Sequence, residues 1–192
     1  MDKYVINGGG RLCGSVALQS AKNSVLPLFA ASILTDKRVI IRDAPNISDV
    51  TCMAQILREL GAEVRFSVGN VTIDSANASC HEISSALTKE LRSSVFMLGS
   101  LLTRFGRALI AYPGGCDIGL RPIDLHLNAL KRLGVTISER DGFIFCECAR
   151  LRGAEILLDF PSVGATENIL LAAVKAEGKT VLTGAAKEPE IV

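Results

Sequence analysis

The sequence predicts an α/β (α+β) fold built from repeated units, and three observations support this prediction. Three segments share one pattern: an apolar helix, a short charged or glycine-containing break, a β-rich run and a loop. The β-rich runs centre near Ile40, Leu109 and Val181, which are 69 and 72 residues apart. The chain is 48% hydrophobic over 192 residues, enough to bury a core. Self-similarity at a fixed period is typical of repeat architectures.

The segments that follow the first two loops also resemble each other. Residues 53–74 and 127–147 each begin as an amphipathic helix, with apolar residues at i, i+3 and i+4, and continue as two alternating strands. Gly61 and Gly134 follow Leu at the helix ends, where a left-handed cap favours glycine. Turns at 68–70 and 140–142 join the strands. The repeating unit is therefore helix, strand, helix, strand, strand.

The third repeat stops part-way. Residues 188–192 match the start of the second helix of the earlier repeats, so a helix, a turn and two strands have no counterpart. Repeats bury their apolar faces against one another, and a partial unit leaves apolar surface open. We expect this chain to be a piece of a longer protein.

Composition excludes several classes of function. The 21 basic and 20 acidic side chains are scattered and nearly balanced, and there is no Trp, so nothing favours nucleic acid or an anionic membrane as a partner. No apolar stretch is long enough to span a bilayer, and the first residues do not form a secretory signal. We expect a cytoplasmic protein whose six cysteines are reduced. With no C-x2-C pair and two histidines, the sequence predicts no metal site.

Two glycine motifs resemble phosphate loops but are better explained otherwise. Gly8-Gly9-Gly10 joins two strand-like runs, YVIN and SVALQ, so we expect a hairpin turn there. Gly178-Lys179-Thr180 has Ala173 where a P-loop requires glycine, and it precedes a strand instead of following one.

Basic residues near helix starts are candidate anion ligands. Lys22 lies in the first turn of the first long helix, which Ser20 can cap. A cation there is mildly unfavourable, which hints at a function, although a solvated lysine is the alternative. Arg92 flanks an apolar helical stripe and is either an exposed arginine or a ligand for a carboxylate or phosphate. Small residues at 162–164 open the third repeat's helix and suit either a polar ligand or an ordinary cap by Ser162.

Cys116 lies in the most informative loop, YPGGCDIGLRPIDLH. The glycines before it let the backbone approach a ligand closely, and Arg121 brings a charge that lowers a thiol pKa. The corresponding loop of the first repeat, DAPNISD, has none of these groups, which argues against a purely structural turn. The alternative is an inert, packed cysteine.

At these positions the sequence resembles the UDP-N-acetylglucosamine 1-carboxyvinyltransferases, the enolpyruvyl transferases that open bacterial peptidoglycan synthesis. The motifs lie along the whole chain in the family's order: SAKNSVLPL, ELRSSVFMLG, PGGCDIGLRPIDLH, PSVGATEN and AAKEPEIV. The resemblance implies lobes of three βαβαββ-type repeats around a pseudo-threefold axis, an inside-out α/β barrel. It implies transfer of the enolpyruvyl group of phosphoenolpyruvate to the 3′-hydroxyl of UDP-N-acetylglucosamine, with release of phosphate and without a cofactor or metal.

The resemblance also implies the role of each site residue. Cys116 is the general acid of an addition–elimination reaction, and the thiol that fosfomycin alkylates. Lys22 and Arg121 hold phosphoenolpyruvate, Asn23 contacts the substrates, and Arg92 binds substrate and helps the lobes close. The uridine and nucleotide contacts are Arg121, Pro122, Ile123, Asp124, Leu125, Ser162, Val163 and Gly164, with Asp124 facing the uracil. Phe160 departs from the lysine that several members carry.

Members of this family are about twice as long as this chain. The resemblance therefore assigns residues 1–21 to a strand pair of a second, absent lobe, and residues 22–192 to an incomplete cysteine-bearing lobe. The missing C-terminal lobe supplies an aspartate and an arginine to the site, so this chain carries half of it. Two alternatives stay open: a non-catalytic nucleotide-sugar binding module, and a related enolpyruvyl transferase with another acceptor.

Overall fold

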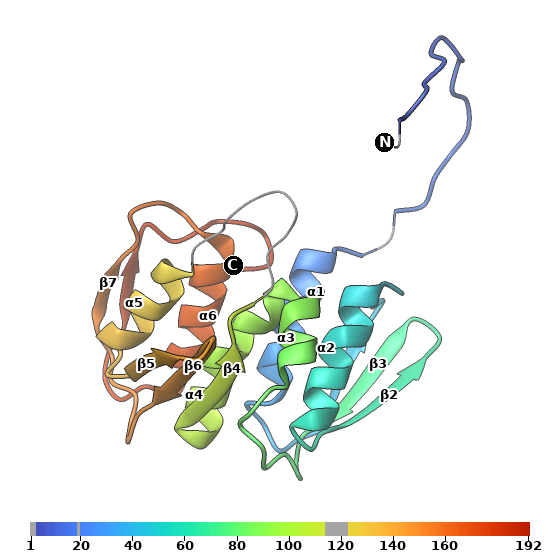
Figure 1. The fold of residues 1–192 in the computed structure, drawn as a ribbon. Coiled ribbons are helices and arrows are strands. Elements are labelled where there is room, and N and C mark those ends of the chain that lie inside the picture. The colour runs from blue at the N-terminus through green and yellow to red at the C-terminus, as the bar shows by residue number, and fades with distance from the viewer. Residues whose placement is uncertain (1–2, 19, 114–122) are drawn as a thin grey trace.

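The structure is a computed structural model that describes residues 3–18, 20–113 and 123–192. Small sheets lie on the outside of a central group of helices (Figure 1). The strands alternate between buried and exposed side chains, as the burial of β3 and β6 shows, so each of these sheets has one face on the core. This arrangement agrees with the expected α/β fold of repeats.

The first repeat forms as the sequence predicts. A helix, a strand, a second helix and a hairpin follow one another: α1 (Lys22–Ser32), β1 (Val39–Arg42), α2 (Ser48–Glu59), β2 (Glu63–Ser67) and β3 (Asn70–Asp74). Gly61 has a φ of 97°, the left-handed conformation expected where α2 ends. Gly69 at the hairpin turn has a φ of 70°.

The second repeat has the same order with one difference. The helix expected around Arg92 is three pieces: α3 (Ser85–Glu90), a 3₁₀ turn η1 (Arg92–Phe96) and α4 (Met97–Phe105). The prediction of one continuous helix was wrong here: Leu91 is extended between α3 and η1, and the side chain of Asn168 bonds to Val95 and Gly99 on either side of the η1–α4 junction. The remaining elements are as expected: β4 (Arg107–Ala111), α5 (Asp124–Arg132), β5 (Thr136–Arg140) and β6 (Phe143–Glu147).

The third repeat contains β7 (Glu155–Leu157), α6 (Val163–Ala173) and β8 (Val181–Thr183). After β8 the described chain continues through a loop to a turn near its last residues, where Ile191 donates to the Glu188 carbonyl at 2.9 Å. β7 was not expected from the sequence.

The sheets of the first two repeats are copies of each other. The strand orders are β1-β3-β2 and β4-β6-β5, antiparallel throughout, with Ile41 opposite Val71 and Ile110 opposite Ile144. In the third repeat β7 pairs in parallel with β8. A single parallel bridge between Glu82 and Leu109 is the counterpart of that pairing in the second repeat.

One helix from each repeat lies at the centre. α1, α4 and α6 contact one another, and every residue from Met97 to Leu102 is buried. Close approach of α4 and α6 requires Gly99, since a Cβ there would lie 2.4 Å from the Asn168 carbonyl oxygen. Three equivalent helices around a common centre agree with the expected pseudo-threefold arrangement.

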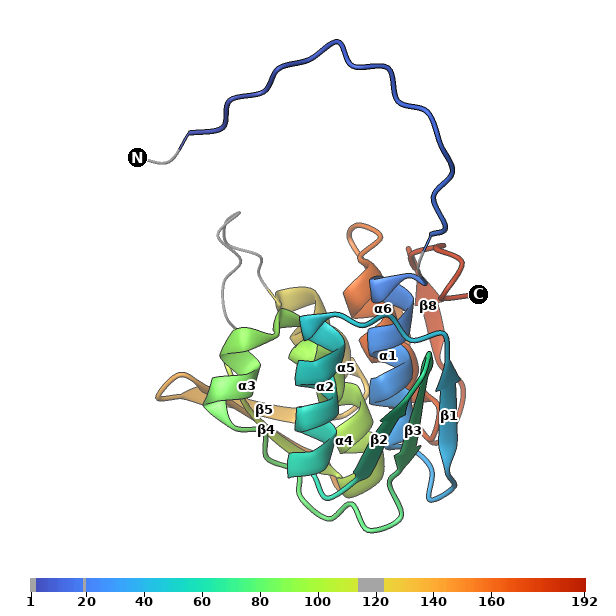
Figure 2. The same cartoon turned by 90° about the vertical axis from the view of Figure 1, so that its right-hand side faces the viewer.

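Residues 3–18 do not form the expected hairpin. They contain neither helix nor strand, and large apolar side chains such as Tyr4 and Leu12 are almost fully exposed. The segment extends away from the body of the molecule (Figures 1 and 2). An isolated two-stranded ribbon is marginal in water, and no strand among the described residues lies beside these runs.

None of the helices in the described ranges is long and apolar enough to cross a membrane.

Candidate functional site

Five helices begin at the same end of the molecule. α1, α2, α4, α5 and α6 all start at the upper end in Figures 1 and 2, because each strand that precedes or follows them runs back toward that end. The first N–H groups of α1, α2, α5 and α6 have no partner within the helix, and the helix dipole places a partial positive charge there. α4 differs, because it continues from η1 and its Gly99 N–H donates to Asn168 Oδ1. This end of the molecule is therefore suited to binding anions.

Lys22 and Asn23 are the first two residues of α1, and both are exposed. The helix has Ala21 at its N-cap without a side-chain hydrogen bond, so the prediction that Ser20 caps it was wrong: Ser20 lies one residue too early. Lys22 Nζ contacts Asp49 Oδ1 at 2.9 Å. The carboxylate from the first turn of α2 thus holds the lysine at the shared helix end.

Arg92 begins η1 and is half-buried, not fully exposed. η1 packs against both α1 and α6. The Arg92 guanidinium lies near enough to His126 to lower its pKa, although burial of the imidazole is the larger cause; together they bring the pKa of His126 to about 4. Arg92 and the start of α5 are therefore close in space.

Asp124 and Leu125 are the first two residues of α5, and Ile123 precedes them as a buried side chain. Asp124 is exposed, and a carboxylate in the first turn of a helix is favourable. Leu125 and Asp159 line a hollow of about 440 Å³ between α5 and the β7 segment. The structure thus presents this stretch to solvent at the helix-start end.

Ser162 caps α6, accepting a hydrogen bond from the Ala165 N–H at 3.3 Å, so the simpler of its two predicted roles is confirmed. Val163 and Gly164 follow and are half-buried. A Cβ at Gly164 would lie 3.0 Å from Phe96 and 3.3 Å from the His126 ring. The start of α6 therefore contacts both η1 and α5, and three of the predicted binding stretches meet here.

Three predicted site residues, Cys116, Arg121 and Pro122, lie outside the described residues. The elements on either side are described: β4 ends at Ala111 and α5 begins at Asp124, both at the end where the helices start (Figure 1).

Two of the other cysteines are buried and poorly reactive. Burial is the main cause that raises the pKa of Cys52 to about 11 and that of Cys146 to about 12, so both are thiols at neutral pH. Cys13 is exposed to solvent, and Cys80 and Cys148 are half-buried. In the described ranges, no group of three or more His, Cys, Asp or Glu side chains is placed to hold a metal ion.

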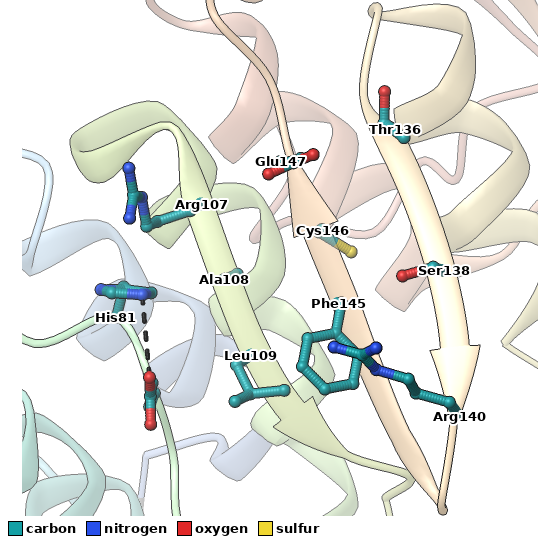
Figure 3. A pocket seen from close by; sticks show the side chains of 11 residues that line it. His81, Arg107, Ala108, Leu109, Thr136, Ser138, Arg140, Phe145, Cys146 and Glu147 are labelled. Atoms are coloured by element: carbon teal, nitrogen blue, oxygen red, sulfur yellow. Dashed lines mark ion pairs between the residues drawn. The ribbon is translucent and has the colours of Figure 1, made fainter.

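A separate hollow of about 360 Å³ lies on the outer face of the β4-β6-β5 sheet (Figure 3). Figure 3 shows Arg140 lying across the ring of Phe145, with the guanidinium carbon 4.5 Å from the ring centre. His81 and Glu82 also line the hollow, and His81 Nε2 lies 3.9 Å from Glu82 Oε1. None of the predicted site residues that the structure describes lines this hollow.

Three residues of the site were missed in the sequence: Asp49, His126 and Asn168. Asp49 lies in the first turn of α2, where acidic residues are common, so nothing in the sequence indicated that it pairs with Lys22. His126 is two residues beyond Asp124 within a motif already singled out, and its spacing was the available signal. Asn168 lies in an otherwise apolar helix, and a buried amide there indicates a specific partner.

The chain is similar to curated proteins over its whole length. It is 51% identical over 191 residues to "UDP-N-acetylglucosamine 1-carboxyvinyltransferase 2" of Caldanaerobacter subterraneus subsp. tengcongensis, with all of this chain and 46% of the relative covered. It is 50% identical over 197 residues to "UDP-N-acetylglucosamine 1-carboxyvinyltransferase 1" of Symbiobacterium thermophilum, covering 45% of it. The chain thus spans less than half the length of these relatives.

Solved structures share the fold. The enolpyruvyl transferase NikO from Streptomyces tendae superposes with a TM-score of 0.81 at 24% identity, over 96% of this chain and 43% of that one. EPSP synthase from Acinetobacter baumannii gives a TM-score of 0.68 at 19% identity, over 93% and 42%. The sequence profile of EPSP synthase (3-phosphoshikimate 1-carboxyvinyltransferase) matches residues 6–192. The chain therefore belongs to the EPSP synthase family of carboxyvinyltransferases.

Proposed function

We propose that this chain is the cysteine-bearing part of a UDP-N-acetylglucosamine 1-carboxyvinyltransferase. The whole enzyme transfers the enolpyruvyl group of phosphoenolpyruvate to the 3′-hydroxyl of UDP-N-acetylglucosamine and releases phosphate. Relatives at 51% and 50% identity that carry this name support the choice of substrates.

The observation that carries the proposal is the common end at which α1, α2, α5 and α6 begin. Phosphoenolpyruvate carries a carboxylate and a phosphate, and the nucleotide sugar carries a diphosphate. Two such anions need several positive groups in one place, and that end combines free helix N–H groups with Lys22 and Arg92.

In the proposed reaction the 3′-hydroxyl gives its proton to the aspartate of the second lobe and its oxygen adds to C2 of phosphoenolpyruvate, while the Cys116 thiol gives its proton to C3. This yields a tetrahedral intermediate with a methyl group. Phosphate then leaves C2 with the proton held by the aspartate, and the Cys116 thiolate takes a proton back from C3, which restores the double bond, now joined to the sugar. Lys22 and Arg121 hold the phosphoenolpyruvate anions, and Asn23 contacts the substrates beside them.

The nucleotide binds along the starts of α5 and α6 in this proposal. Arg121, Pro122, Ile123, Asp124 and Leu125 form the uridine stretch, with Asp124 toward the uracil. The start of α6, with Ser162, Val163 and Gly164, lies next to this stretch, and Gly164 packs against the ring of His126 in α5. Arg92 lies beside them on η1, which packs on α6.

We further propose that the isolated chain turns over slowly or not at all. Residues 1–21 belong to a strand pair of the second lobe in this view, and that lobe completes the site when the two close. The exposed apolar side chains of residues 3–18 support this assignment, because the second lobe would cover them.

The test is phosphate release by the whole enzyme that contains this chain, given phosphoenolpyruvate and UDP-N-acetylglucosamine. We expect turnover, and a loss of about 10²-fold or more for Cys116→Ala, as for removal of a general acid. Cys80→Ala is the matched control, and it should retain activity. Binding of the nucleotide sugar without any phosphate release would favour a non-catalytic binding module. Turnover with a different acceptor alcohol, without preference for uridine nucleotides, would favour a related transferase.

A further inference from the structure

A single buried amide connects the three stretches that meet at the start of α6. Asn168 is fully buried on α6, four residues beyond Gly164. Its Oδ1 accepts a hydrogen bond from the Gly99 N–H at 2.7 Å, and its Nδ2 donates to the Val95 carbonyl at 3.2 Å. The same Nδ2 lies 3.1 Å from Nδ1 of His126.

The backbone determines which way this amide points. The Gly99 N–H can only donate and the Val95 carbonyl can only accept, so Oδ1 must face the first and Nδ2 the second. Both N–H groups of the amide are then used, one on Val95 and one on His126. None of these contacts is formed by a neighbour in sequence, because Gly99 and Asn168 are 69 residues apart.

The orientation of the amide in turn determines the tautomer of His126. Since Nδ2 donates, Nδ1 of the imidazole must be the unprotonated acceptor, and the ring proton lies on Nε2. Protonation of Nδ1 would place two N–H groups against each other in a buried site. The Nε2 side of the ring lies toward Gly164, where a Cβ would be 3.6 Å from Nε2.

The amide also determines where Arg92 lies. In a regular α-helix the Gly99 N–H would donate to the Val95 carbonyl. Here the Asn168 side chain bonds to both groups instead, at the point where η1 becomes α4. Arg92 is three residues before Val95, which is one turn of a 3₁₀ helix. A change at Asn168 therefore moves the segment that carries Arg92.

We propose that Asn168 is a positioning residue, whose amide holds both the Arg92 segment and the Nε2-protonated form of His126 in register with the start of α6. The consequence for catalysis rests on the proposed function: Asn168 touches no substrate, but it sets the relative positions of groups that bind the nucleotide sugar. Loss of the amide then weakens substrate binding more than it slows the chemical step.

The first test is NMR of the imidazole nitrogens in the 192-residue chain labelled with ¹⁵N-histidine. The chain has two histidines, and the half-exposed His81 is an internal control. In the wild type we expect His126 Nδ1 to resonate as an unprotonated nitrogen. Asn168→Asp keeps the size and the acceptor for Gly99 but removes the donor, so the ring proton should move to Nδ1. Asn168→Ala should shift the backbone amides of residues 92–96.

Thr103→Val is the matched control for both variants. Thr103 Oγ1 joins α4 to α6 at the other end of the same helix pair, donating to the Leu171 carbonyl at 2.9 Å. Its loss should leave the His126 tautomer and the amides of residues 92–96 unchanged. A wild-type His126 with the proton on Nδ1 would overturn the inference without any variant. So would an Asn168→Asp chain whose imidazole and amide signals match the wild type.

The second test measures kinetics in the whole enzyme. Both Asn168 variants should raise KM for UDP-N-acetylglucosamine about tenfold, with kcat changed less than about threefold, and Thr103→Val should do neither. Unchanged kinetics alongside altered NMR signals would reduce Asn168 to a structural role and overturn the positioning claim. If the wild-type enzyme does not bind the nucleotide sugar, the proposed function fails, and the NMR result still decides whether Asn168 holds these two groups.

Discussion

Lys22 Nζ lies 2.9 Å from Asp49 Oδ1, so an ion pair joins the first turns of α1 and α2 at the end where the helices begin. The side chains remain 49% and 27% exposed, and pairs of this kind contribute little to stability. A lysine in the first turn of a helix is also unfavourable with respect to the helix dipole. Since the pair adds little to the stability of the fold, we infer that its role is to hold the Lys22 ammonium group at this end of the molecule.

We expect Lys22→Ala to lower kcat of the whole enzyme about 100-fold, because in the proposed reaction the cation stabilises charge that develops on phosphoenolpyruvate. The free energy of unfolding should change by less than about 1 kcal/mol. Chemical denaturation and phosphate release measured on one preparation separate the two effects. Asp49→Asn is the control: it breaks the same pair but keeps the lysine, and it should cost less activity. Equal losses of activity for both variants would contradict this prediction, because they would show that activity depends on the intact ion pair and not on the Lys22 charge itself.

Gly99 and Ser100 are neighbours in α4 with opposite expected responses to alanine. A Cβ at Gly99 would lie 2.4 Å from the Asn168 carbonyl oxygen and 2.6 Å from its Oδ1, so Gly99→Ala should lower the free energy of unfolding by about 3 kcal/mol. Ser100 Oγ is buried with no hydrogen-bond partner among the described residues. Ser100→Ala should therefore be neutral or stabilising. Urea denaturation of both variants decides, and a tolerated Gly99→Ala would contradict the described packing of α4 on α6.

Arg104 connects the second repeat to the first. Its side chain is 13% exposed, donates to the carbonyls of Ile33 at 2.9 Å and Ser75 at 2.8 Å, and pairs with Asp36. Arg104→Met keeps the apolar stem but removes the guanidinium donor from both carbonyls, of which that of Ser75 keeps the Ala78 N–H at 3.1 Å, so we expect a loss of about 2 kcal/mol in unfolding free energy. Asp36→Asn removes only the exposed partner and should cost under about 1 kcal/mol. Similar costs for the two would show that the buried carbonyl contacts contribute little.

Glu167 should make the stability of this chain depend on pH. Burial, followed by the charges of Glu190 and Glu188, raises its pKa to about 7 from 4.5. The folded state then binds a proton more tightly than the unfolded state, so its stabilising contribution is complete below about pH 4.5 and is lost as the pH rises through about 7.

The variant Glu167→Gln cannot titrate at this position. Wild type should lose up to about 3 kcal/mol relative to it between pH 5 and pH 8, since one pKa unit corresponds to about 1.4 kcal/mol. Wild type and Glu167→Gln are compared at each pH, so the contribution of His126, which is the same in both, cancels. The lowered pKa of His126 reduces the free energy of unfolding as the pH falls from 6.5 to about 4. Exposed Glu155→Gln controls for the lost charge. A constant difference across this range would contradict a raised pKa for Glu167.

Much of the fold could be predicted because its signals are local. Gly61 and Gly134 end their helices with φ values of 97° and 91°, and the hairpin turns fall at the predicted residues. Apolar periodicity identified α2 and α5, and Ser162 caps α6 as expected. In each case the sequence within a few residues determines the conformation.

Long-range contacts were not predictable from these local signals. The 3₁₀ turn η1 passes into α4 where Asn168 bonds from 69 residues away, and the strand β7 pairs with β8. The partnership of Lys22 with Asp49 spans 27 residues. The strand pair expected before residue 22 depends on a partner in the same way: residues 3–18 form neither helix nor strand, and the prediction that they pair within a second lobe stays a prediction.

The measurement to make first is reaction of the whole enzyme with fosfomycin, with and without UDP-N-acetylglucosamine, followed by peptide mass spectrometry. The other cysteines of this chain serve as internal controls, since Cys52 and Cys146 are buried thiols of raised pKa and Cys13 is exposed. If Cys116 is the general acid of a UDP-N-acetylglucosamine carboxyvinyltransferase, it alone should be modified, and faster when the nucleotide sugar is present. Modification spread over the exposed cysteines, or no effect of the nucleotide sugar on Cys116, would contradict that role.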